Sequence, residues 1–420
     1  MKKNIFLLLL FLVAFSGFSQ TNQLYKQSLA AYKSKDYALF LKLNKQLDSI
    51  RPSHPVFSYN VAAGYSLTKK ENEAIAALKS VVLMNNTIPF EEEADFQNIK
   101  TTAGFQKVIA LKEAQNKVIE SSNFKVSLSE KDLHPEGLVY LDKQKLWLAS
   151  SIRNKKIVSF DSKGVCSDWF IDTPYSVFAL KADEKQRYLW VSCSAMPEMK
   201  NFTEAVDGRN EILKIDIKTR RLVKRYILDD KHVFGDLVVA KNGDVYISDS
   251  KDPIIYKIQN DKIPHEKIVV WKDLKGTALN LQGLTFNADQ SKLFIADYLK
   301  GIMVVTMKDD FKTSWLAIPD GATKKGIDGM LYYKNSLIAI QNGAVPIRIV
   351  KYNLNTENTQ ITDFKVLDNN RAIFNEPALA TISNGKLYFF ANSPWKFYSD
   401  NKELDETKFE NPKLFELQLD

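Results

Sequence analysis

The sequence has few of the residues that carry soft-metal or redox chemistry. Only two of its 420 residues are cysteine, Cys166 and Cys193, and only four are histidine. Zinc centres need Cys or His ligands at short, characteristic spacings, and no such spacing occurs here. A thiolate metal centre is therefore excluded by number. For the two cysteines, two separate small hydrophobic side chains are favoured over a disulfide, which stays open as the alternative.

The sequence also lacks a long apolar run after its first residues. Lys2 and Lys3 precede an uncharged apolar stretch over 5–15, and the small residues Gly17 and Ser19 follow within 17–19. This pattern predicts a secretory signal peptide over 1–19, which is too short for a membrane span. No cysteine follows the stretch to carry a lipid, and no later run approaches the ~20 apolar residues of a membrane span. We therefore expect export to the periplasm or the medium and no membrane span.

Basic residues are not gathered into blocks. Lysine and arginine exceed aspartate and glutamate by eight, and Lys2 and Lys3 contribute two of that excess. The remaining basic residues are interspersed with acids, which offers no electropositive groove to a phosphate backbone. No nucleic-acid partner is expected.

Residues 20–115 have helical periodicity. Apolar residues recur at three- and four-residue steps through 74–82, as on one face of a helix. Two segments are alike, and their tyrosines, Tyr32 and Tyr65, are 33 residues apart. The segments resemble tetratricopeptide (TPR) repeats, with a third, degenerate unit through Phe96 and Phe105. The resemblance implies a small helical repeat domain whose groove could hold a protein partner.

After a linker at 116–122 the period changes from 3.6 to 2, and short strands rich in Val, Ile, Tyr and Phe follow. One pair of strands recurs six times, for example Glu136-Gly-Leu-Val-Tyr followed by Leu146-Trp-Leu-Ala-Ser-Ser. The anchors of the six second strands are spaced 43, 56, 48, 44 and 50 residues apart, and they are Trp147, Trp190, Tyr246, Phe294, Ile338 and Tyr388. Six such units predict a six-bladed β-propeller over 123–420.

The sixth unit runs out of chain at its third strand. An apolar segment near 124–128 is available to complete it, and a strand borrowed from the N-terminal end closes the ring without an exposed edge. The fold class is therefore mostly β, a six-bladed β-propeller preceded by a small α-helical, TPR-like domain.

The first strand of each propeller blade lines the central channel, so the residues at its start should ring one mouth. These residues are Glu136, Phe178, Asp236, Gln282, Asp328 and Glu376. Four of the six are acids and one is an amide, an oxygen-only set that suits Ca²⁺, Mg²⁺ or Mn²⁺. Each acid alone could instead cap a strand, but the ring as a whole favours a divalent cation.

Loops on the same face add candidates for substrate binding. Arg153 and Asn392 could hold a polar substrate. The loop over 195–209, which carries Met196, is either a lid over the mouth or an insertion packed on the propeller face. A second aromatic-rich loop over 393–411 could also cover the mouth, or it could form the surface against which the helical module docks.

The propeller sequence resembles the regucalcin/gluconolactonase family over about 123–420. The segments that carry the resemblance are His134-Pro-Glu-Gly-Leu, Gly235-Asp-Leu-Val, Leu281-Gln-Gly-Leu-Thr-Phe and Ile327-Asp-Gly-Met. In that family a divalent cation, often Ca²⁺, is held by a Glu, an Asn and an Asp. The resemblance implies metal ligands at Glu136, Gln282 and Asp328, with Gln282 standing where the family has Asn.

The resemblance further implies that Asp328 serves as general base and that Asp236 occupies the position of a substrate-contacting Asn. Glu376 is the second candidate base. These roles predict hydrolysis of a lactone or small ester, with a cation polarising the carbonyl and a carboxylate taking a proton from water. The alternative is a non-catalytic binding or scaffold protein that uses the propeller rim and the helical groove, since propellers perform both roles.

Overall fold

The computed structural model describes residues 20–260, 267–308, 310–398 and 405–420, so the signal peptide expected at 1–19 lies outside the described residues. The chain divides into two compact units, Met1–Lys117 and Val118–Asp420. No helix in the described ranges is long and apolar enough to cross a membrane.

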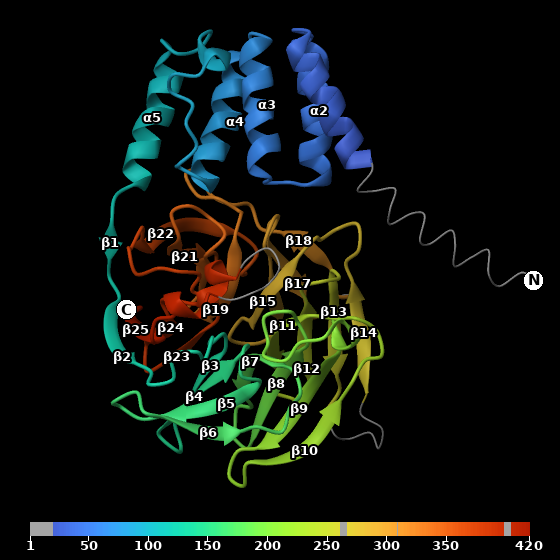
Figure 1. Ribbon diagram of the computed structural model, residues 1–420, viewed down its shortest axis with the longest axis vertical. Helices are drawn as coiled ribbons and strands as arrows, with labels where there is room; N and C mark the ends of the chain where they lie inside the picture. The colour runs from blue at the N-terminus through green and yellow to red at the C-terminus, as the bar shows by residue number, and fades with distance from the viewer. Residues whose placement is uncertain (1–19, 261–266, 309, 399–404) are drawn as a thin grey trace, which may run out of the picture. The chain divides into compact units, whose positions relative to one another are not determined.

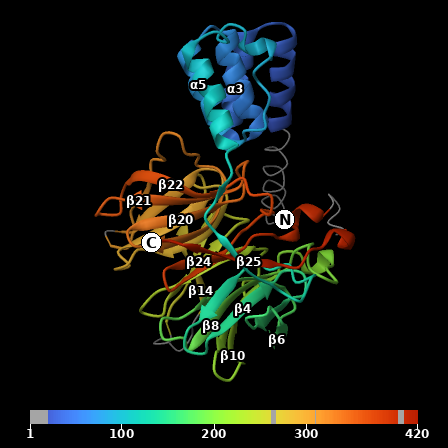
Figure 2. The ribbon, with the colours of Figure 1, turned by 90° about the vertical axis from the view of Figure 1, so that its left-hand side faces the viewer.

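The first unit is a helical bundle (Figures 1 and 2). A helix over 20–33 precedes its other elements, which are α2 (Tyr37–Ile50), α3 (Pro55–Leu67), α4 (Glu71–Met84), η1 (Ala94–Phe96) and α5 (Ala103–Gln115). Small residues let α2 and α3 approach closely, since a Cβ at Gly64 would lie 3.0 Å from the Cβ of Leu41. The third, degenerate unit contains only a 3₁₀ turn before α5, and Phe96 and Phe105 are both buried there.

The second unit is a six-bladed β-propeller, as the sequence pattern predicts. Its six sheets each contain four strands in antiparallel order, and the fifth sheet carries one more. The strands of the first three blades are β3 (Leu138–Leu141), β4 (Leu146–Ser151), β5 (Lys156–Phe160), β6 (Cys166–Phe170); β7 (Ser176–Ala182), β8 (Tyr188–Ser194), β9 (Asn210–Asp216), β10 (Arg221–Tyr226); and β11 (Phe234–Val239), β12 (Val245–Asp249), β13 (Ile254–Ile258), β14 (Ile268–Asp273).

The last three blades complete the ring, and Figure 2 shows β24 and β25 between the strands of blade 5 and β4 of blade 1. Their strands are β15 (Leu281–Phe286), β16 (Lys292–Asp297), β17 (Gly301–Thr306), β18 (Thr313–Trp315); β19 (Ile327–Tyr333), β20 (Ser336–Gln341), β21 (Arg348–Leu354), β22 (Ile361–Asn369); and β23 (Ala380–Ser383), β24 (Lys386–Phe390), β25 (Lys413–Gln418), β2 (Asn123–Ser127). Three 3₁₀ turns lie in loops, and they are η2 (Glu204–Val206), η3 (Pro394–Phe397) and η4 (Glu406–Lys408).

The N-terminal segment of the propeller takes part in two blades. In Figure 1, β2 lies beside β25, with which it pairs as the outer strand of blade 6. The segment 116–122, expected as a linker, contains β1 (Ile119–Glu120), which pairs with β22 of blade 5. The buried carboxylate of Asp368 accepts hydrogen bonds from the backbone N–H groups of Ser121 and Ser122 at 2.6 and 3.1 Å. These contacts hold the segment on the sheet, because a buried carboxylate without donors would be costly.

Apolar side chains fill the spaces between neighbouring blades. One such cluster joins blades 1 and 2 through Leu148, Trp169 and Leu189. The two cysteines are both free, Cys193 buried within this cluster and Cys166 half-buried at the start of β6. They act as small core side chains, as expected.

Candidate functional site

A pocket of about 230 Å³ lies where the first strands converge. Its lining includes five of the six residues expected around the mouth, and its members are Glu136, Phe178, Met196, Val233, Gly235, Ser250, Gln282, Tyr298, Asp328, Asn342, Glu376 and Trp395. Residues from all six blades therefore meet in one cavity. This convergence follows from the repeat, because equivalent positions of a propeller blade are brought to the same level of the channel.

The backbone around the pocket depends on the small residue that follows the mouth position. A Cβ at Gly137 would lie 2.2 Å from the carbonyl oxygen of Phe178, and one at Gly283 would lie 2.6 Å from the carbonyl oxygen of Asp328. Glycine therefore permits neighbouring first strands to approach at the axis. In three blades a serine hydroxyl of the second strand also accepts the N–H of this residue, and the pairs are Gly137 with Ser150 (2.6 Å), Ala179 with Ser192 (3.0 Å) and Asp236 with Ser248 (3.3 Å).

These hydrogen bonds show that the mouth position of blade 3 is one residue earlier than expected. Asp236 occupies the level of Gly137, and Gly235 lines the pocket in its place. The extra residue between Phe234 and Asp236 in the pairing with β12 has counterparts in the first strands of blades 2, 4 and 5, so blade 3 keeps the common register and its mouth position is Gly235. The expectation that Asp236 stands on the mouth ring is therefore corrected.

Asp236 is buried below the pocket and is held by its neighbours. Its carboxylate accepts the N–H of Leu284 at 3.1 Å and lies 3.5 Å from the ammonium of Lys181. Burial raises the pKa of Asp236, while Lys181 opposes that rise. Substrate contact by Asp236 stays a prediction. From its position below the pocket, Asp236 acts on the other acids electrostatically, because its negative charge raises the pKa of both Glu136 and Asp328.

Glu136 and Asp328 are the central acids of the pocket. Burial raises the pKa of Asp328 to about 7, and the charges of Glu376 and Asp236 add to the rise. Burial, together with the charge of Asp328, places the pKa of Glu136 well above its ordinary value. Two such groups disfavour full ionisation of each other, because each charge is poorly solvated and faces another of the same sign. The pocket therefore favours a proton or a cation between them.

Two polar side chains orient these acids. Asn342 Nδ2 donates to Asp328 Oδ2 at 2.6 Å, which opposes the rise in the pKa of Asp328. The indole N–H of Trp395 donates to Glu136 Oε2 at 3.4 Å. Asn342 Oδ1 is buried and has no hydrogen-bond partner in the described part of the chain, so one amide oxygen of the pocket is available to a ligand.

Gln282 and Glu376 complete the polar wall. Gln282 Nε2 donates to Asn280 Oδ1 at 2.8 Å, and Gln282 Oε1 accepts from the hydroxyl of Ser250 at 3.4 Å. Glu376 has a backbone φ of 49°, an unusual value for a residue with a Cβ. Burial raises the pKa of Glu376, and the nearby Lys396 lowers it.

The oxygen atoms that line the pocket are of the chemical types that coordinate a hard cation. Carboxylates of Glu136 and Asp328 and amide oxygens of Gln282 and Asn342 are the ligand types that Ca²⁺ takes in proteins. Among the residues that the structure describes, no three or more His, Cys, Asp or Glu side chains are grouped so that they could hold a metal ion. A cation here would therefore depend on amide oxygens and water besides the two carboxylates.

Two residues expected to bind substrate do not line this pocket. Arg153 pairs with the carboxylate of Glu406, and its guanidinium lies 5.6 Å from the ring centre of Phe409. Asn392 binds backbone on the flank of blade 6, donating to the carbonyl of Asn411 at 3.2 Å and accepting the N–H of Lys413 at 2.8 Å. Both side chains therefore have partners of their own, which strand position alone could not indicate.

Three pocket residues were missed by the sequence reasoning and share one signal. Ser250, Tyr298 and Asn342 are each the first residue after the second strand of their blade, at β12, β16 and β20. The end of each second strand carries this signal in the repeat register, whereas the expected mouth ring rests on the first strands alone. Met196 and Trp395 come from the two loops expected over the mouth, and both line the pocket.

The two histidines near first strands do not form a pair at the mouth. His232 Nδ1 is 2.6 Å from Asp249 Oδ2 in the core near blade 3. His134 Nδ1 is 2.9 Å from the hydroxyl of Tyr398. Neither imidazole is part of the pocket lining, which leaves carboxyl groups as its acid–base residues.

These observations define a propeller with a carboxyl-rich channel pocket. In overall structure the chain is similar to a gluconolactonase from Xanthomonas campestris, at 13% identity over 73% of this chain and 93% of that chain, with a TM-score of 0.47. It is similar to the calcium-binding protein regucalcin from Agrobacterium tumefaciens, at 13% identity over 70% and 93%, with a TM-score of 0.47. It is also similar to virginiamycin B lyase from Staphylococcus aureus, at 15% identity over 70% and 98%, with a TM-score of 0.46.

The sequence matches no known protein-family pattern and no curated protein. At this level of similarity none of the three structures assigns an activity to the chain.

Proposed function

We propose that the channel pocket hydrolyses a lactone or a small ester and that it binds a divalent cation, for which Ca²⁺ is the best chemical match. The observation that carries this proposal is the pair Glu136 and Asp328, a buried and a half-buried carboxyl in one pocket whose pKa values are both raised. A bound cation would supply charge neutralisation of this pair and polarisation of a carbonyl oxygen.

Asp328 is the general base in this proposal. With a pKa of about 7 it is ionised in roughly half of the molecules at neutral pH, which suits a group that must accept a proton from water. The amide of Asn342 holds one carboxylate oxygen, so the other is left to face the pocket. Glu376, also with a raised pKa, is the second candidate for this role.

The remaining walls would receive the substrate. Phe178, Met196 and Trp395 supply apolar surface to the lining, and they limit the water that reaches the pocket. No lysine or arginine lines the pocket among the described residues, so a neutral substrate fits better than an anionic one.

Cation binding and hydrolysis can be tested separately. Thermal unfolding in EDTA, and again with Ca²⁺ restored, should differ by several degrees in the wild type, because a ligand of the native state stabilises it. Asp328→Ala should remove the difference, whereas Glu184→Gln, at an exposed turn, should retain it. No difference in the wild type, or an equal one in Asp328→Ala, would contradict the cation site.

Hydrolysis is measured as acid release from a panel of lactones and short esters. Asp328→Asn should reduce the rate by about 10²–10⁴-fold for a lost general base. A wild-type protein that hydrolyses nothing on the panel but binds Ca²⁺ would favour the alternative, a non-catalytic binding protein.

We also propose that the chain is exported, on the leader pattern of 1–19. Fractionation of bacterial cells that express the full chain or a chain without 2–19 tests this. Equal distribution of the two forms would contradict export.

A further inference from the structure

Tyr298 brings to the channel pocket a hydroxyl that the protein itself does not use. Within the described residues this hydroxyl makes no hydrogen bond, and it is not one of the buried polar atoms that solvent cannot reach. Every other N–H or hydroxyl donor among the side chains of the lining already donates to the protein, and these donors belong to Ser250, Gln282, Asn342 and Trp395. Tyr298 is therefore the donor of the described lining that is left for a ligand.

The backbone on both sides of Tyr298 is fixed. Its N–H donates to the carbonyl of Asn280 at 2.9 Å, and its carbonyl accepts the N–H of Gly326 at 2.7 Å. The fully buried carboxylate of Asp297, the preceding residue, accepts four backbone N–H groups, which belong to Leu279, Asn280, Leu299 and Lys300. These contacts hold the base of the side chain at the end of β16, as a preorganised donor requires.

The hydroxyl end of the ring reaches the loop of blade 5 that also supplies Asn342. A Cβ at Gly343 would lie 2.4 Å from both Cζ and the hydroxyl oxygen of Tyr298, so the absence of a side chain there leaves room for the ring. Burial raises the pKa of Tyr298, and the charges of Asp328 and Glu376 add to the rise. The hydroxyl therefore lies within the electrostatic reach of both candidate bases. Even an unshifted phenol, with a pKa of about 10, keeps its proton at neutral pH.

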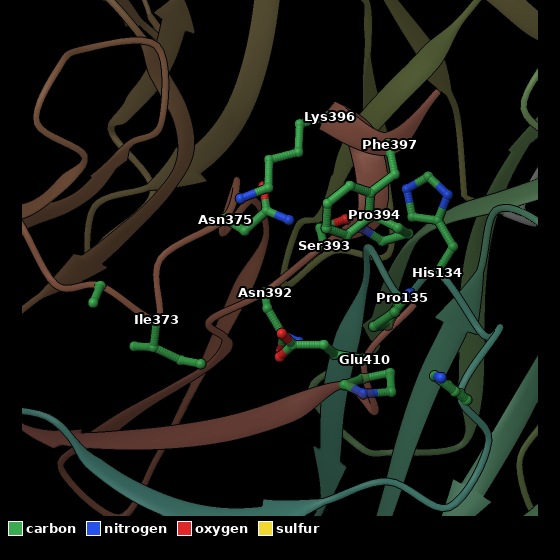
Figure 3. A pocket seen from close by; sticks show the side chains of 13 residues that line it. His134, Pro135, Ile373, Asn375, Asn392, Ser393, Pro394, Lys396, Phe397 and Glu410 are labelled. Carbon is green, nitrogen blue, oxygen red and sulfur yellow. The ribbon is translucent and has the colours of Figure 1, made fainter. Parts of the chain in front are cut away.

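No cationic side chain takes the place of this hydroxyl in the described lining. Lys396 acts on Glu376 through its charge, but Figure 3 shows the Lys396 side chain at a separate cavity, together with Asn375 and Asn392. None of Lys396, Asn375 and Asn392 lines the channel pocket. A ligand oxygen in the channel pocket therefore has Tyr298 as its uncommitted protein donor.

A fixed neutral hydroxyl suits an oxygen atom that gains negative charge during a reaction. When water attacks an ester carbonyl, the π electrons move to the acyl oxygen, which carries the charge in the tetrahedral intermediate. A hydrogen bond to that charged oxygen is stronger than one to the neutral carbonyl. The donor therefore stabilises the transition state more than the bound substrate, which raises kcat.

We propose that Tyr298 is a catalytic residue whose hydroxyl donates a hydrogen bond to the acyl oxygen of the lactone or ester in the channel pocket. The inference rests on the proposed hydrolase function and adds an oxyanion donor to it. Water forms the new bond to the acyl carbon and loses a proton to Asp328, while the acyl oxygen takes the negative charge beside the Tyr298 hydroxyl. The carbonyl then forms again, the bond to the leaving oxygen breaks, and that oxygen takes the proton from Asp328. Tyr298 keeps its own proton throughout.

The experiment compares wild type, Tyr298→Phe and Tyr140→Phe in the full chain, with the lactone or ester that the wild type hydrolyses fastest. Tyr140→Phe is the matched control, because it removes a tyrosine hydroxyl on β3, outside the pocket lining. Tyr298→Phe should lower kcat by about 10²-fold, as for the loss of one oxyanion donor. KM should stay within about threefold of the wild type, since the hydrogen bond acts on the transition state. A kcat of Tyr298→Phe within about threefold of the Tyr140→Phe value would overturn the proposal.

Thermal unfolding separates this role from a structural one. Because the Tyr298 hydroxyl bonds to no described residue, Tyr298→Phe should keep the midpoint of the wild type and the same response to Ca²⁺. A lower midpoint would place the hydroxyl in the packing of the propeller, and a lost Ca²⁺ response would place it in the cation site. Either result would overturn the assignment as a donor to the acyl oxygen.

A probe that is not turned over keeps the donor testable if the wild type hydrolyses nothing, which would contradict the proposed hydrolase function. δ-Valerolactam presents a ring carbonyl of the same kind, and its binding is measured by calorimetry. Its affinity should fall about three- to tenfold in Tyr298→Phe, as for one lost neutral hydrogen bond, and should be unchanged in Tyr140→Phe. In that case absent binding to the wild type, or equal affinity in wild type and Tyr298→Phe, would overturn the donor as well.

Discussion

The half-buried carboxyl of Asp328 permits a quantitative prediction about stability. Its pKa is raised from 3.8 to about 7, which at 1.36 kcal/mol per pKa unit corresponds to about 4 kcal/mol. Because the side chain is partly exposed to pocket water, we reduce the expected effect to about 2–4 kcal/mol. Asp328→Asn, which cannot ionise, should therefore be more stable than the wild type when no cation is present.

The sign of the pH dependence follows from linkage. A carboxyl whose folded pKa exceeds its unfolded pKa contributes its full stability below the unfolded value, and this contribution is lost as the pH rises through the folded value. For Asp328 the loss runs from about pH 4 to just above pH 7. The wild type should thus lose stability relative to Asp328→Asn between pH 5 and pH 8, and the two should converge below pH 4.

The assay is thermal unfolding of the propeller transition in EDTA, followed by circular dichroism at pH 5 and pH 8. With an unfolding entropy of about 2.1 cal/mol/K per residue over 118–420, the expected difference at pH 8 is roughly 3–6 °C in favour of Asp328→Asn. Glu184→Gln removes an exposed carboxylate and should show no such difference. If Asp328→Asn were no more stable than the wild type at pH 8, the reasoning on charge repulsion in the pocket would be refuted. Saturating Ca²⁺ should reduce or reverse the difference, since the cation stabilises only the charged form.

Three further substitutions test the packing. Gly137→Ala should destabilise the propeller by about 2 kcal/mol or more, because the added Cβ would lie 2.2 Å from the carbonyl oxygen of Phe178. The effect is measured as a lower denaturation midpoint, and an unchanged midpoint would contradict the close approach of the two strands. Asp368→Ala should lower the free energy of unfolding by about 1–3 kcal/mol and speed amide exchange at Ser122, because the Asp368 carboxylate accepts the N–H of Ser122. Unaltered exchange at Ser122 would contradict the role of Asp368 in holding this segment on the sheet. Phe105→Ala should cost the helical unit about 3–5 kcal/mol, measured by calorimetry, because this ring is fully buried; a loss below 1 kcal/mol would mean that the core is not as described.

The number of blades could be predicted because each blade repeats its physical requirements in order. Glycine follows the mouth residue where strands crowd at the axis, as at Gly137 and Gly283, and an aromatic or aliphatic anchor such as Trp147 fills the space between blades. These requirements act within some ten residues of one another, so they appear directly in the sequence. The same repeat locates Glu136, Gln282 and Asp328 at the channel pocket.

The sequence alone thus determined the six-bladed architecture and most of the acidic ring, because both follow from local periodicity and from equivalence between repeats. Only the tertiary structure decided that Gly235 lines the pocket and Asp236 lies below it, since the level of each residue is set by its contacts with the second strand, as in the hydrogen bond from the N–H of Asp236 to Ser248. It also decided that Arg153 and Asn392 have partners elsewhere, and that Asn342 holds Asp328. These partners come from different strands and loops, within one blade for Asn342 and Asn392 and across the seam between blades 1 and 6 for Arg153, so their contacts depend on how the strands pair and how the ring closes.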